Sequence, residues 1–395
     1  MKAEKVLVVH NYYQIPGGED TVVANEIKLL EDHGHEVLLY SRNNTELKTF
    51  SKVQKLLLPI TTVFNPKTYK EVKKIIKEKN IDIVHVHNTL NLVSPSVYYA
   101  ARSCKVPIVQ TIHNFRLLCP AATLYRDGHI CEECLQKGIL CSLKYNCYRG
   151  SKLQTLACVL TSKIHRAMGI YKKINYICLT EFNKNKLLEI NNGKRKKLIL
   201  PKQVYVKPNF TFEELDCSNA EDGKYYLFVG RVEKIKGMDV LIEAFSNLPE
   251  ETIVIAGKGT ELEYYQEQMV QRNLKNVSFL GFQKKEQVQE LMKNAKAMIV
   301  PSQWYEGFPM TIVEALSAGT PVIGADIGNI SSLVKQGVNG WKFKYDSPQE
   351  LVNAIKLCNR TPRKNLNVSC DGAVLAEENY KVLKQIYENA LKCVK

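Results

Sequence analysis

The 395-residue sequence predicts an α/β protein built of two doubly wound parallel sheets. Short apolar runs alternate with amphipathic segments along nearly the whole chain, which favours parallel strands joined by helices. A polar, acidic stretch at 211–224 interrupts this alternation, and the same pattern then restarts. A chain of this length has room for two ordinary domains. We therefore expect domains over 1–208 and 209–377, facing a cleft.

The first domain is expected to begin with a strand over Val6–His10. A loop with Pro16, Gly17 and Gly18 follows, and then a helix from about Asp20. Because glycine has no Cβ, Gly17 and Gly18 would let this loop approach a ligand closely; a tight turn before the helix is the alternative. Further strands are predicted over Glu36–Tyr40, Ile81–Val86, Pro107–Thr111, Asn175–Leu179 and Val204–Asn209.

Polar residues follow several of these strands, at the sheet edge where open α/β sheets bind ligands. His113 and Asn114 come directly after one strand. A single histidine in this position can also be structural. His85 and His87 end another strand, and the alternation of side chains places both on one face. They are candidates for a metal pair or for the wall of a ligand-binding cleft.

The second domain contains two segments with charged residues after predicted strands. Its strands are expected over Tyr225–Val229, Thr252–Ile255, Val277–Leu280, Ala297–Val300, Val322–Gly324 and Trp341–Phe343. After the first of them, Arg231 offers a planar fork for phosphate oxygens and Lys236 a compact positive charge. Two cations at the mouth of a sheet fit a diphosphate, although either could be an ordinary surface residue.

After Ala297–Val300, a loop and a helix contain two glutamates, Glu306 and Glu314. Thr311 and Glu314 have the spacing of a capping box, which predicts that the helix begins at Thr311. Glu306 would then lie on the loop and Glu314 in the first helical turn. Backbone N–H groups at such a helix start suit a phosphate or a polyhydroxylated ligand. The alternative is that Glu314 only caps the helix.

The two motifs, G-R-x4-K-G followed by E-x7-E, resemble those of retaining glycosyltransferases of the GT-B fold, family 4. The resemblance implies two Rossmann-like domains, with a C-terminal helix at about 378–395 returning to the first, acceptor-binding domain. It implies that Arg231 and Lys236 bind the donor diphosphate and that Glu314 binds the ribose. Glu306 would orient the transferred sugar, and His113 would lie at the reaction centre.

The same resemblance assigns further donor contacts. Gly17 and Gly18 would face the donor phosphate. The segment with Phe308, Pro309, Met310 and Thr311 would contact sugar and phosphate through its backbone. It implies that the configuration at the anomeric carbon is retained and that catalysis needs no metal or other cofactor. The leaving phosphate would take up the proton of the acceptor hydroxyl.

Net charge is unevenly distributed. Residues 1–208 hold 33 Lys+Arg against 16 Asp+Glu, whereas 209–395 hold 22 against 24. A basic half suggests a polyanionic partner such as an anionic membrane surface, a lipid-diphosphate acceptor or nucleic acid. The basic segment 48–79 is either a solvated helix face or a surface that lies on anionic lipid. Lys194–Lys197 is a second basic cluster.

Twelve cysteines are many for a protein that we expect to be cytoplasmic, since neither a secretory signal nor an eighteen-residue apolar run is present. Five of them lie in a Cys-rich insert at 119–150. Cys119, Cys131, Cys134 and Cys147 could bind a structural zinc ion, with Cys141 as a substitute for one of them. Reduced, unliganded thiols are the alternative, and disulfides are less compatible with the cytoplasm.

The sequence therefore predicts a glycosyltransferase that moves a sugar from a nucleotide diphosphate sugar to a glycan or lipid-linked saccharide in cell-surface polysaccharide assembly, peripheral to the inner membrane face. A GT-B epimerase or hydrolase is the alternative within enzymes; it would turn over the donor without an acceptor. A nucleic-acid-binding protein is the alternative of another class. The basic residues are not interleaved with a recognisable reading motif, so no nucleic acid partner is expected.

Overall fold

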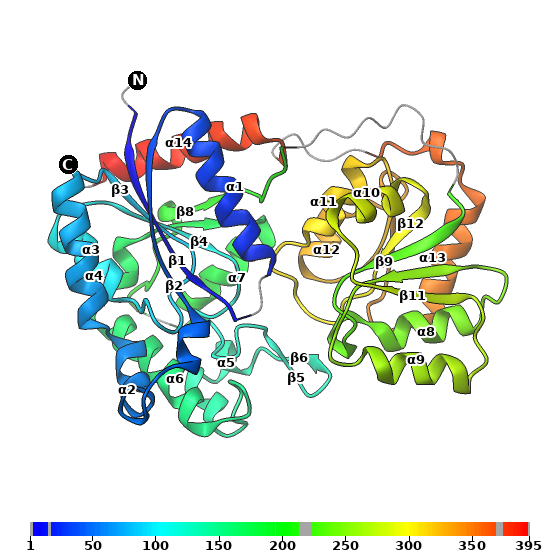
Figure 1. The fold of residues 1–395 in the computed structure, drawn as a ribbon, viewed down its shortest axis with the longest axis horizontal. Helices are drawn as coiled ribbons and strands as arrows, with labels where there is room; N and C mark the ends of the chain where they lie inside the picture. Colours follow the sequence, from blue (N-terminus) through cyan, green and yellow to red (C-terminus); the bar gives the residue numbers. More distant parts are fainter. Residues whose placement is uncertain (1–2, 15–16, 194, 213–222, 369–373, 394–395) are drawn as a thin grey trace. The chain divides into compact units, whose positions relative to one another are not determined.

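The computed structural model describes residues 3–14, 17–193, 195–212, 223–368 and 374–393 (Figure 1). The chain divides into two compact units. Unit 1 comprises Met1–Leu124, Cys131–Phe210 and Ala376–Lys395, and unit 2 comprises Tyr125–Ile130 and Thr211–Leu375. The predicted first domain contains the whole Cys-rich insert, whereas the structure groups the segment Tyr125–Ile130 of this insert with unit 2. Most of the predicted linker, Pro16 and Lys194 lie outside the described residues.

Unit 1 is built on a six-stranded parallel sheet of order β2-β1-β3-β4-β7-β8. Its strands span Lys5–Tyr12 (β1), Glu36–Asn43 (β2), Ile83–Val86 (β3), Ile108–Ile112 (β4), Asn175–Cys178 (β7) and Val204–Val206 (β8). The central strands β3, β4 and β7 are buried along their whole length. This explains their apolar sequences, since helices cover both faces of a parallel sheet.

The helices of unit 1 connect these strands and cover the sheet (Figure 1). They span Gly18–Asp32 (α1), Lys52–Val63 (α2), Pro66–Lys79 (α3), Ser96–Ser103 (α4), Glu133–Gln136 (α5), Lys152–Ala167 (α6), Glu181–Leu188 (α7) and Ala376–Lys392 (α14). Side chains of α1 and α14 share one hydrophobic core with β1, β3, β4 and β7. The C-terminal helix therefore packs on the sheet of unit 1.

Unit 2 repeats the architecture with a different strand order, β11-β10-β9-β12-β13-β14, again all parallel. The strands span Tyr225–Val229 (β9), Ile253–Ala256 (β10), Val277–Gly281 (β11), Ala295–Val300 (β12), Val322–Ala325 (β13) and Gly340–Phe343 (β14). The helices span Met238–Ser246 (α8), Leu262–Gln271 (α9), Lys285–Lys293 (α10), Met310–Ser317 (α11), Gly328–Leu333 (α12) and Pro348–Arg360 (α13). A short antiparallel hairpin, Tyr125–Arg126 (β5) with His129–Ile130 (β6), completes the unit.

All twelve strands predicted from the sequence are present, each within a few residues of its expected bounds. The predicted class of two doubly wound parallel sheets is confirmed. Within the part of the chain that the structure describes, no helix is both long and apolar enough to cross a membrane.

Candidate active site

The loops after β9 and β12 define a candidate site in unit 2. These two strands are the neighbours at which the strand order reverses, and open α/β sheets bind ligands at the carboxyl ends of such a pair. The loop after β9 carries Arg231 and Lys236, and the loop after β12 carries Glu306. The sheet therefore brings Lys236 and Glu306, 70 residues apart in the sequence, to one edge.

Lys236 and Glu306 form an ion pair, with Nζ 2.7 Å from Oε1 and side chains only 19% and 11% exposed. The same oxygen accepts hydrogen bonds from Ser302 Oγ at 2.6 Å and Trp304 Nε1 at 3.0 Å. Burial alone would raise the pKa of Glu306, but Lys236 and these hydrogen bonds outweigh it and lower the pKa below its ordinary value. Glu306 is therefore an ionised carboxylate with little freedom to move.

Two residues that sequence analysis did not single out hold these loops. The Asn329 side chain donates hydrogen bonds to the backbone oxygens of Glu306 and Gly307, each at 2.6 Å. Gly237 has a φ of +83°, and a Cβ there would lie 1.8 Å from the Pro301 carbonyl oxygen. This close approach seats the loop after β9 against the loop after β12. The glycine was visible in the first motif, whereas no signal in the sequence marks Asn329.

The helix after Glu306 begins one residue earlier than predicted. α11 starts at Met310 with Pro309 as its N-cap, and the Ile312 N–H donates to the Pro309 carbonyl. The predicted capping box of Thr311 and Glu314 is therefore wrong, because Thr311 is already helical and cannot be the N-cap. Proline has no side-chain group that can cap, so the Pro309 side chain does not compete for the first N–H groups of the helix.

The remaining predicted donor residues of unit 2 lie near this helix or at the surface. Phe308 lies in the loop before α11. Glu314 lies on α11 and lines a cavity of about 170 Å³ together with Val229 and Lys285. Arg231 is 59% exposed and pairs with Glu233 at 2.8 Å. The structure thus joins Lys236 directly to Glu306 and leaves Arg231 at the surface.

In unit 1, Gly17 and Gly18 lie at the start of α1. The Gly17 backbone is extended (φ −137°, ψ 178°), and no described residue comes within 4 Å of a Cβ built on either glycine. Neither the backbone conformation nor packing therefore requires glycine here, and the open space allows a ligand to approach. The Asp20 carboxylate accepts hydrogen bonds from the Gly17 N–H at 3.0 Å and pairs with His10 at 2.8 Å.

His113 directly follows β4 and contacts His87. The two rings stack at 5.3 Å, and His87 Nδ1 lies 3.0 Å from His113 Nε2. Burial, and then the adjacent imidazole, lower the pKa of His113 well below its ordinary value. Burial likewise lowers the pKa of His87 to about 4. Both rings are therefore neutral near pH 7, with one donating and the other accepting the hydrogen bond between them.

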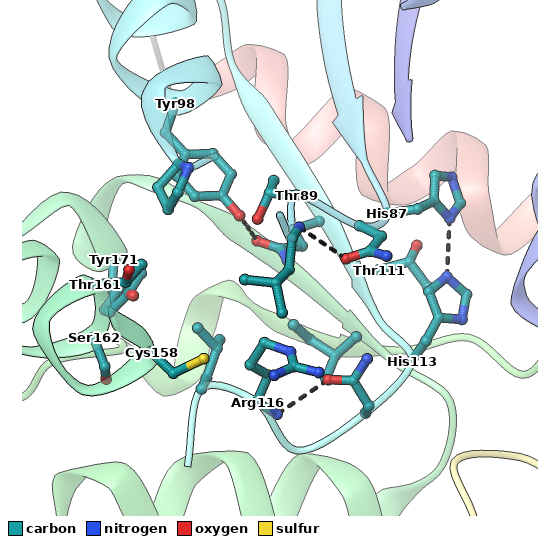
Figure 2. Close-up of a pocket in the computed structure, with 17 residues that line it drawn as sticks. His87, Thr89, Tyr98, Thr111, His113, Arg116, Cys158, Thr161, Ser162 and Tyr171 are labelled. Carbon is teal, nitrogen blue, oxygen red and sulfur yellow. Dashed lines mark hydrogen bonds between the residues drawn. The ribbon is translucent and has the colours of Figure 1, made fainter. Parts of the chain in front are cut away.

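A cavity of about 80 Å³ lies beside this histidine pair, at the carboxyl ends of β3 and β4 and against α4 and α6 (Figure 2). His87, His113 and Arg116 line it, and the Tyr98 hydroxyl donates to the Gln110 side chain at 2.5 Å. Sequence patterns did not reveal this cavity, because its walls come from several separate segments that only the fold assembles.

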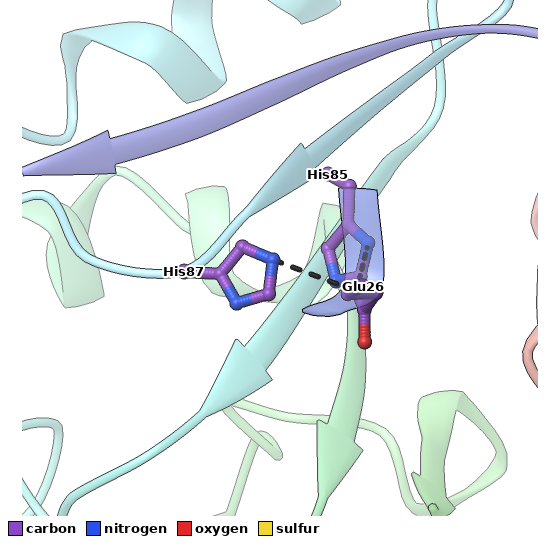
Figure 3. Close-up of side chains that lie close together, drawn as sticks. All are labelled: Glu26, His85 and His87. Atoms are coloured by element: carbon purple, nitrogen blue, oxygen red, sulfur yellow. Dashed lines mark ion pairs between the residues drawn. The ribbon is translucent and has the colours of Figure 1, made fainter. Parts of the chain in front are cut away.

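Glu26, His85 and His87 form a cluster in which three ligand atoms lie close enough for a metal ion (Figure 3). Glu26 Oε1 lies 2.9 Å from His85 Nδ1 and 3.5 Å from His87 Nε2. The Lys207 ammonium, however, lies 2.9 Å from the other oxygen of Glu26 and already neutralises its charge. Both ring nitrogens of His85 also have partners, the Tyr387 and Thr111 hydroxyls, at 2.8 Å. We therefore interpret the cluster as a buried charge network.

The Cys-rich insert brings a partly different set of thiols together than the one predicted. Cys134 Sγ lies 3.5 Å from Cys141 Sγ. A hydrogen bond from Cys134 is the main cause that lowers the pKa of Cys119 to about 6. The N–H groups of Cys131 and Cys147 donate to the Leu124 and Ser142 carbonyls. The zinc site of Cys119, Cys131, Cys134 and Cys147, with Cys141 as a substitute for one of them, stays a prediction.

The chain is similar to known proteins along most of its length. The family model described as glycosyl transferases group 1 matches residues 212–369, and that of glycosyltransferase family 4 matches 16–129. An uncharacterized glycosyltransferase of Methanocaldococcus jannaschii is 25% identical over 366 residues, 89% of this chain and 87% of that protein. The UDP-Gal:alpha-D-GlcNAc-diphosphoundecaprenol alpha-1,3-galactosyltransferase of Escherichia coli is 24% identical over 373 residues, again 89% and 87%.

Among solved structures, Anabaena HepE in complex with UDP and glucose superposes with a TM-score of 0.61, at 19% identity over 99% of both chains. Two parallel-sheet units of this kind, with both family matches, define a glycosyltransferase of the GT-B fold. The chain belongs to the group 1 glycosyltransferases, family 4. The family predicted from the two sequence motifs is thereby confirmed.

Proposed function

We propose that this protein is a retaining glycosyltransferase that moves a sugar from a nucleotide diphosphate sugar to a lipid-linked saccharide during cell-surface polysaccharide assembly. The observation that carries the proposal is the Lys236–Glu306 ion pair at the strand-order reversal of unit 2. The UDP and glucose bound by HepE and the diphosphoundecaprenol-linked acceptor of the Escherichia coli relative support it. The enzyme would work at the inner face of the plasma membrane, on its anionic lipids.

The donor would bind along the carboxyl edge of the unit 2 sheet. Lys236 and Arg231 would hold the diphosphate, whose negative charge grows as the glycosidic bond breaks. The start of α11, within Phe308–Thr311, has no side-chain cap at Pro309, and the N–H groups of a helix start suit phosphate or sugar oxygens. Glu314 would accept hydrogen bonds from the ribose hydroxyls, as carboxylates do in dinucleotide-binding folds. Glu306 would accept hydrogen bonds from hydroxyls of the transferred sugar.

Unit 1 would supply the acceptor side. The open space at Gly17 and Gly18 suits close approach of the donor phosphate to the start of α1. His113 would lie beside the developing oxocarbenium ion. A neutral ring suits this role better than an imidazolium, because it adds no positive charge next to a cationic centre.

The reaction would proceed on one face of the donor sugar. The acceptor hydroxyl oxygen forms a bond to the anomeric carbon while the bond from that carbon to the phosphate oxygen breaks. The hydroxyl proton passes to the leaving phosphate, so no separate base is needed. Glu306 is a poor nucleophile, because Lys236 and two further hydrogen bonds hold its carboxylate. A covalent intermediate on Glu306 is therefore disfavoured, and we propose that retention proceeds without one.

NMR analysis of the product from an α-linked donor tests this mechanism. The expected product is α-linked, and a β-linked product would rule out retention. The same experiment without acceptor separates the alternatives within enzymes. If the donor were hydrolysed or epimerised at the full rate with no acceptor present, the transferase assignment of the site would be wrong.

A further inference from the structure

Helices α2 and α6 of unit 1 expose aliphatic side chains to solvent on neighbouring surfaces. On α2, Val53, Leu56 and Ile60 are 66%, 77% and 66% exposed, and their spacing of three and four residues places them on one helix face. On α6, Leu153, Leu160 and Ile164 are 62%, 43% and 39% exposed. We call these six residues the α2–α6 surface.

The two helices pack against each other, so the six side chains belong to one region of the molecule (Figure 1). The His165 ring of α6 joins them, since its Nε2 lies 2.9 Å from the backbone oxygen of Val63 at the end of α2. The two packed helices thus expose several large aliphatic side chains in one region, and exposed apolar regions of this kind mark interaction sites.

The charges on the two chain segments that carry this surface are of one sign. Residues 47–70, which include α2, contain five lysines and no Asp or Glu. Residues 134–180, which include α6, contain eight Lys+Arg and no Asp or Glu. Lys52, Lys55 and Lys163 are exposed on the same two helices as the aliphatic side chains. An apolar face with lysines on its helices and no carboxylates is the pattern of a surface that inserts between anionic lipid headgroups.

The neighbouring helix α3 shows that this pattern is specific. α3 carries six lysines, against two on α2, but its apolar residues Val72 and Ile76 are buried in the core. Of the two interpretations left open for the basic segment 48–79, the solvated helix face therefore describes α3, whereas α2 presents its apolar side chains to solvent.

From these observations we infer that the α2–α6 surface is the place at which unit 1 docks on an anionic lipid bilayer. A second copy of the chain is a poor occupant, because a symmetric interface would bring these lysines against themselves. Single-stranded nucleic acid is also a poor occupant, since bases stack on aromatic side chains and this surface is aliphatic.

The inner face of α6 lines the cavity beside His87 and His113, with Cys158, Thr161 and Ser162. A bilayer on the outer face of α6 would therefore hold lipid-linked saccharides within reach of that cavity. The docking inference and this link to the acceptor both rest on the membrane location in the proposed function, whereas sugar transfer itself does not require docking, so docking and transfer can fail separately.

The test is cosedimentation of the full chain with vesicles of phosphatidylcholine, with and without phosphatidylglycerol, in the absence of any sugar. We expect binding only to the anionic vesicles and a loss of binding as salt is raised. In the variant Leu56→Ser/Leu160→Ser the partition coefficient should fall about tenfold or more, since each buried CH₂ contributes ~0.8 kcal/mol. Lys52→Gln/Lys55→Gln should also weaken binding, by about fivefold for each lysine.

The matched control is Val270→Ser/Phe282→Ser, which removes side chains of unit 2 that are 81% and 67% exposed. It should bind vesicles like the unaltered protein. The inference would be overturned if Leu56→Ser/Leu160→Ser bound anionic vesicles as well as the unaltered protein does. It would also be overturned if, without lipid, this variant differed from the unaltered protein in oligomeric state. Circular dichroism checks that both double variants are folded. Sugar transfer to a water-soluble acceptor should be unchanged in both double variants. Failure of the proposed transferase function is thereby distinguished from failure of lipid docking.

Discussion

Lys236 and Glu306 show how single residues set the chemistry of the unit 2 site. The Lys236 ammonium, 2.7 Å from the Glu306 carboxylate, helps to keep that carboxylate ionised in a largely buried place. Trp304 and Ser302 add hydrogen bonds to the same carboxylate oxygen. The pair is thus a preorganised positive and negative charge, which costs no rearrangement when a phosphate or a sugar hydroxyl arrives.

Replacing Lys236 by methionine should destabilise unit 2 by roughly 3 kcal/mol, because it leaves the buried Glu306 carboxylate without its countercharge. Urea unfolding followed by tryptophan fluorescence measures this, since both tryptophans lie in unit 2. Lys234→Met is the control, because that lysine is 67% exposed. The double variant Lys236→Met/Glu306→Gln should regain stability but not transferase activity. If Lys236→Met and Lys234→Met had the same free energy of unfolding, Lys236 would not be needed as the countercharge of Glu306.

Replacing Glu314 by alanine tests the ribose contact. We expect the affinity for nucleoside diphosphates to fall at least about tenfold, since hydrogen bonds to a charged group contribute roughly 1.5–3 kcal/mol. Isothermal titration calorimetry measures the change. Glu243→Ala, on the exposed face of α8, should bind like the unaltered protein. An unchanged affinity in Glu314→Ala would remove this residue from the nucleotide site.

At the scale of elements, the loop after β9 depends on one glycine. Gly237 combines a positive φ with a close approach to Pro301, whereas Gly337 has a similar φ of +70° and no described atom near its Cβ position. Gly337→Ala should therefore cost only the left-handed backbone strain, roughly 1–2 kcal/mol. Gly237→Ala should cost more and also reduce donor affinity, because the two loops must separate. Equal unfolding free energies for the two variants would contradict this account.

The Cys-rich insert is the element for which a metal is expected. Tetrahedral zinc with Zn–S bonds of about 2.3 Å holds its thiolates about 3.8 Å apart, close to the 3.5 Å between Cys134 and Cys141. We expect about one zinc per chain by elemental analysis of protein purified without chelators. The variant Cys134→Ser should lose it, and Cys104→Ser, outside the insert, should keep it. A content below about 0.2 zinc in the unaltered protein would contradict the site.

At the scale of the whole molecule, a buried charge network ties the C-terminal helix α14 to the rest of unit 1. Lys207 Nζ contacts Glu26 on α1 at 2.9 Å and the Asn379 side chain on α14 at 3.0 Å. Burial opposes the ionised form of Glu26, but Lys207 and His85 outweigh it and hold its pKa well below the ordinary value. Segments almost two hundred residues apart thus share one desolvated charge pair.

This network predicts that unit 1 is sensitive to mild acid. The pKa of His87 is about 4 in the folded protein and about 6.5 when unfolded, so the unfolded chain binds the proton first as pH falls. Stability is therefore complete above pH 6.5 and is lost progressively toward pH 4, by roughly 3 kcal/mol for this residue. The lowered pKa of Glu26 adds a further loss at lower pH.

Urea unfolding followed by circular dichroism at several pH values between 7.5 and 4.5 measures the effect. A variant His87→Asn should show a shallower dependence on pH across this window. If the unaltered protein and the variant lost stability equally, His87 would not be held neutral by burial. His129→Asn, an exposed residue of the β5–β6 hairpin, is a control that should follow the unaltered protein.

The strands and the charged motifs could be read from the sequence because their signals are local. A buried parallel strand such as β12 is a short apolar run, and its carboxyl end is marked by the proline and polar residues that follow. The start of α11 was missed by one residue, since the spacing of Thr311 and Glu314 resembles a capping box although Pro309 takes the N-cap position. Asn329 could not be found, because its contacts to the Glu306 loop are purely tertiary.

By itself, the sequence determined two successive α/β units, the family, and the two loops that carry Arg231, Lys236 and Glu306. Only the tertiary structure decided the strand orders, the Lys236–Glu306 and Glu26–Lys207 pairs, and the exposure of aliphatic side chains on α2 and α6. The physical reason is the distance along the sequence over which each signal acts. Strand and loop signals arise from neighbouring residues, whereas burial and charge pairing depend on which distant segments the sheet brings together.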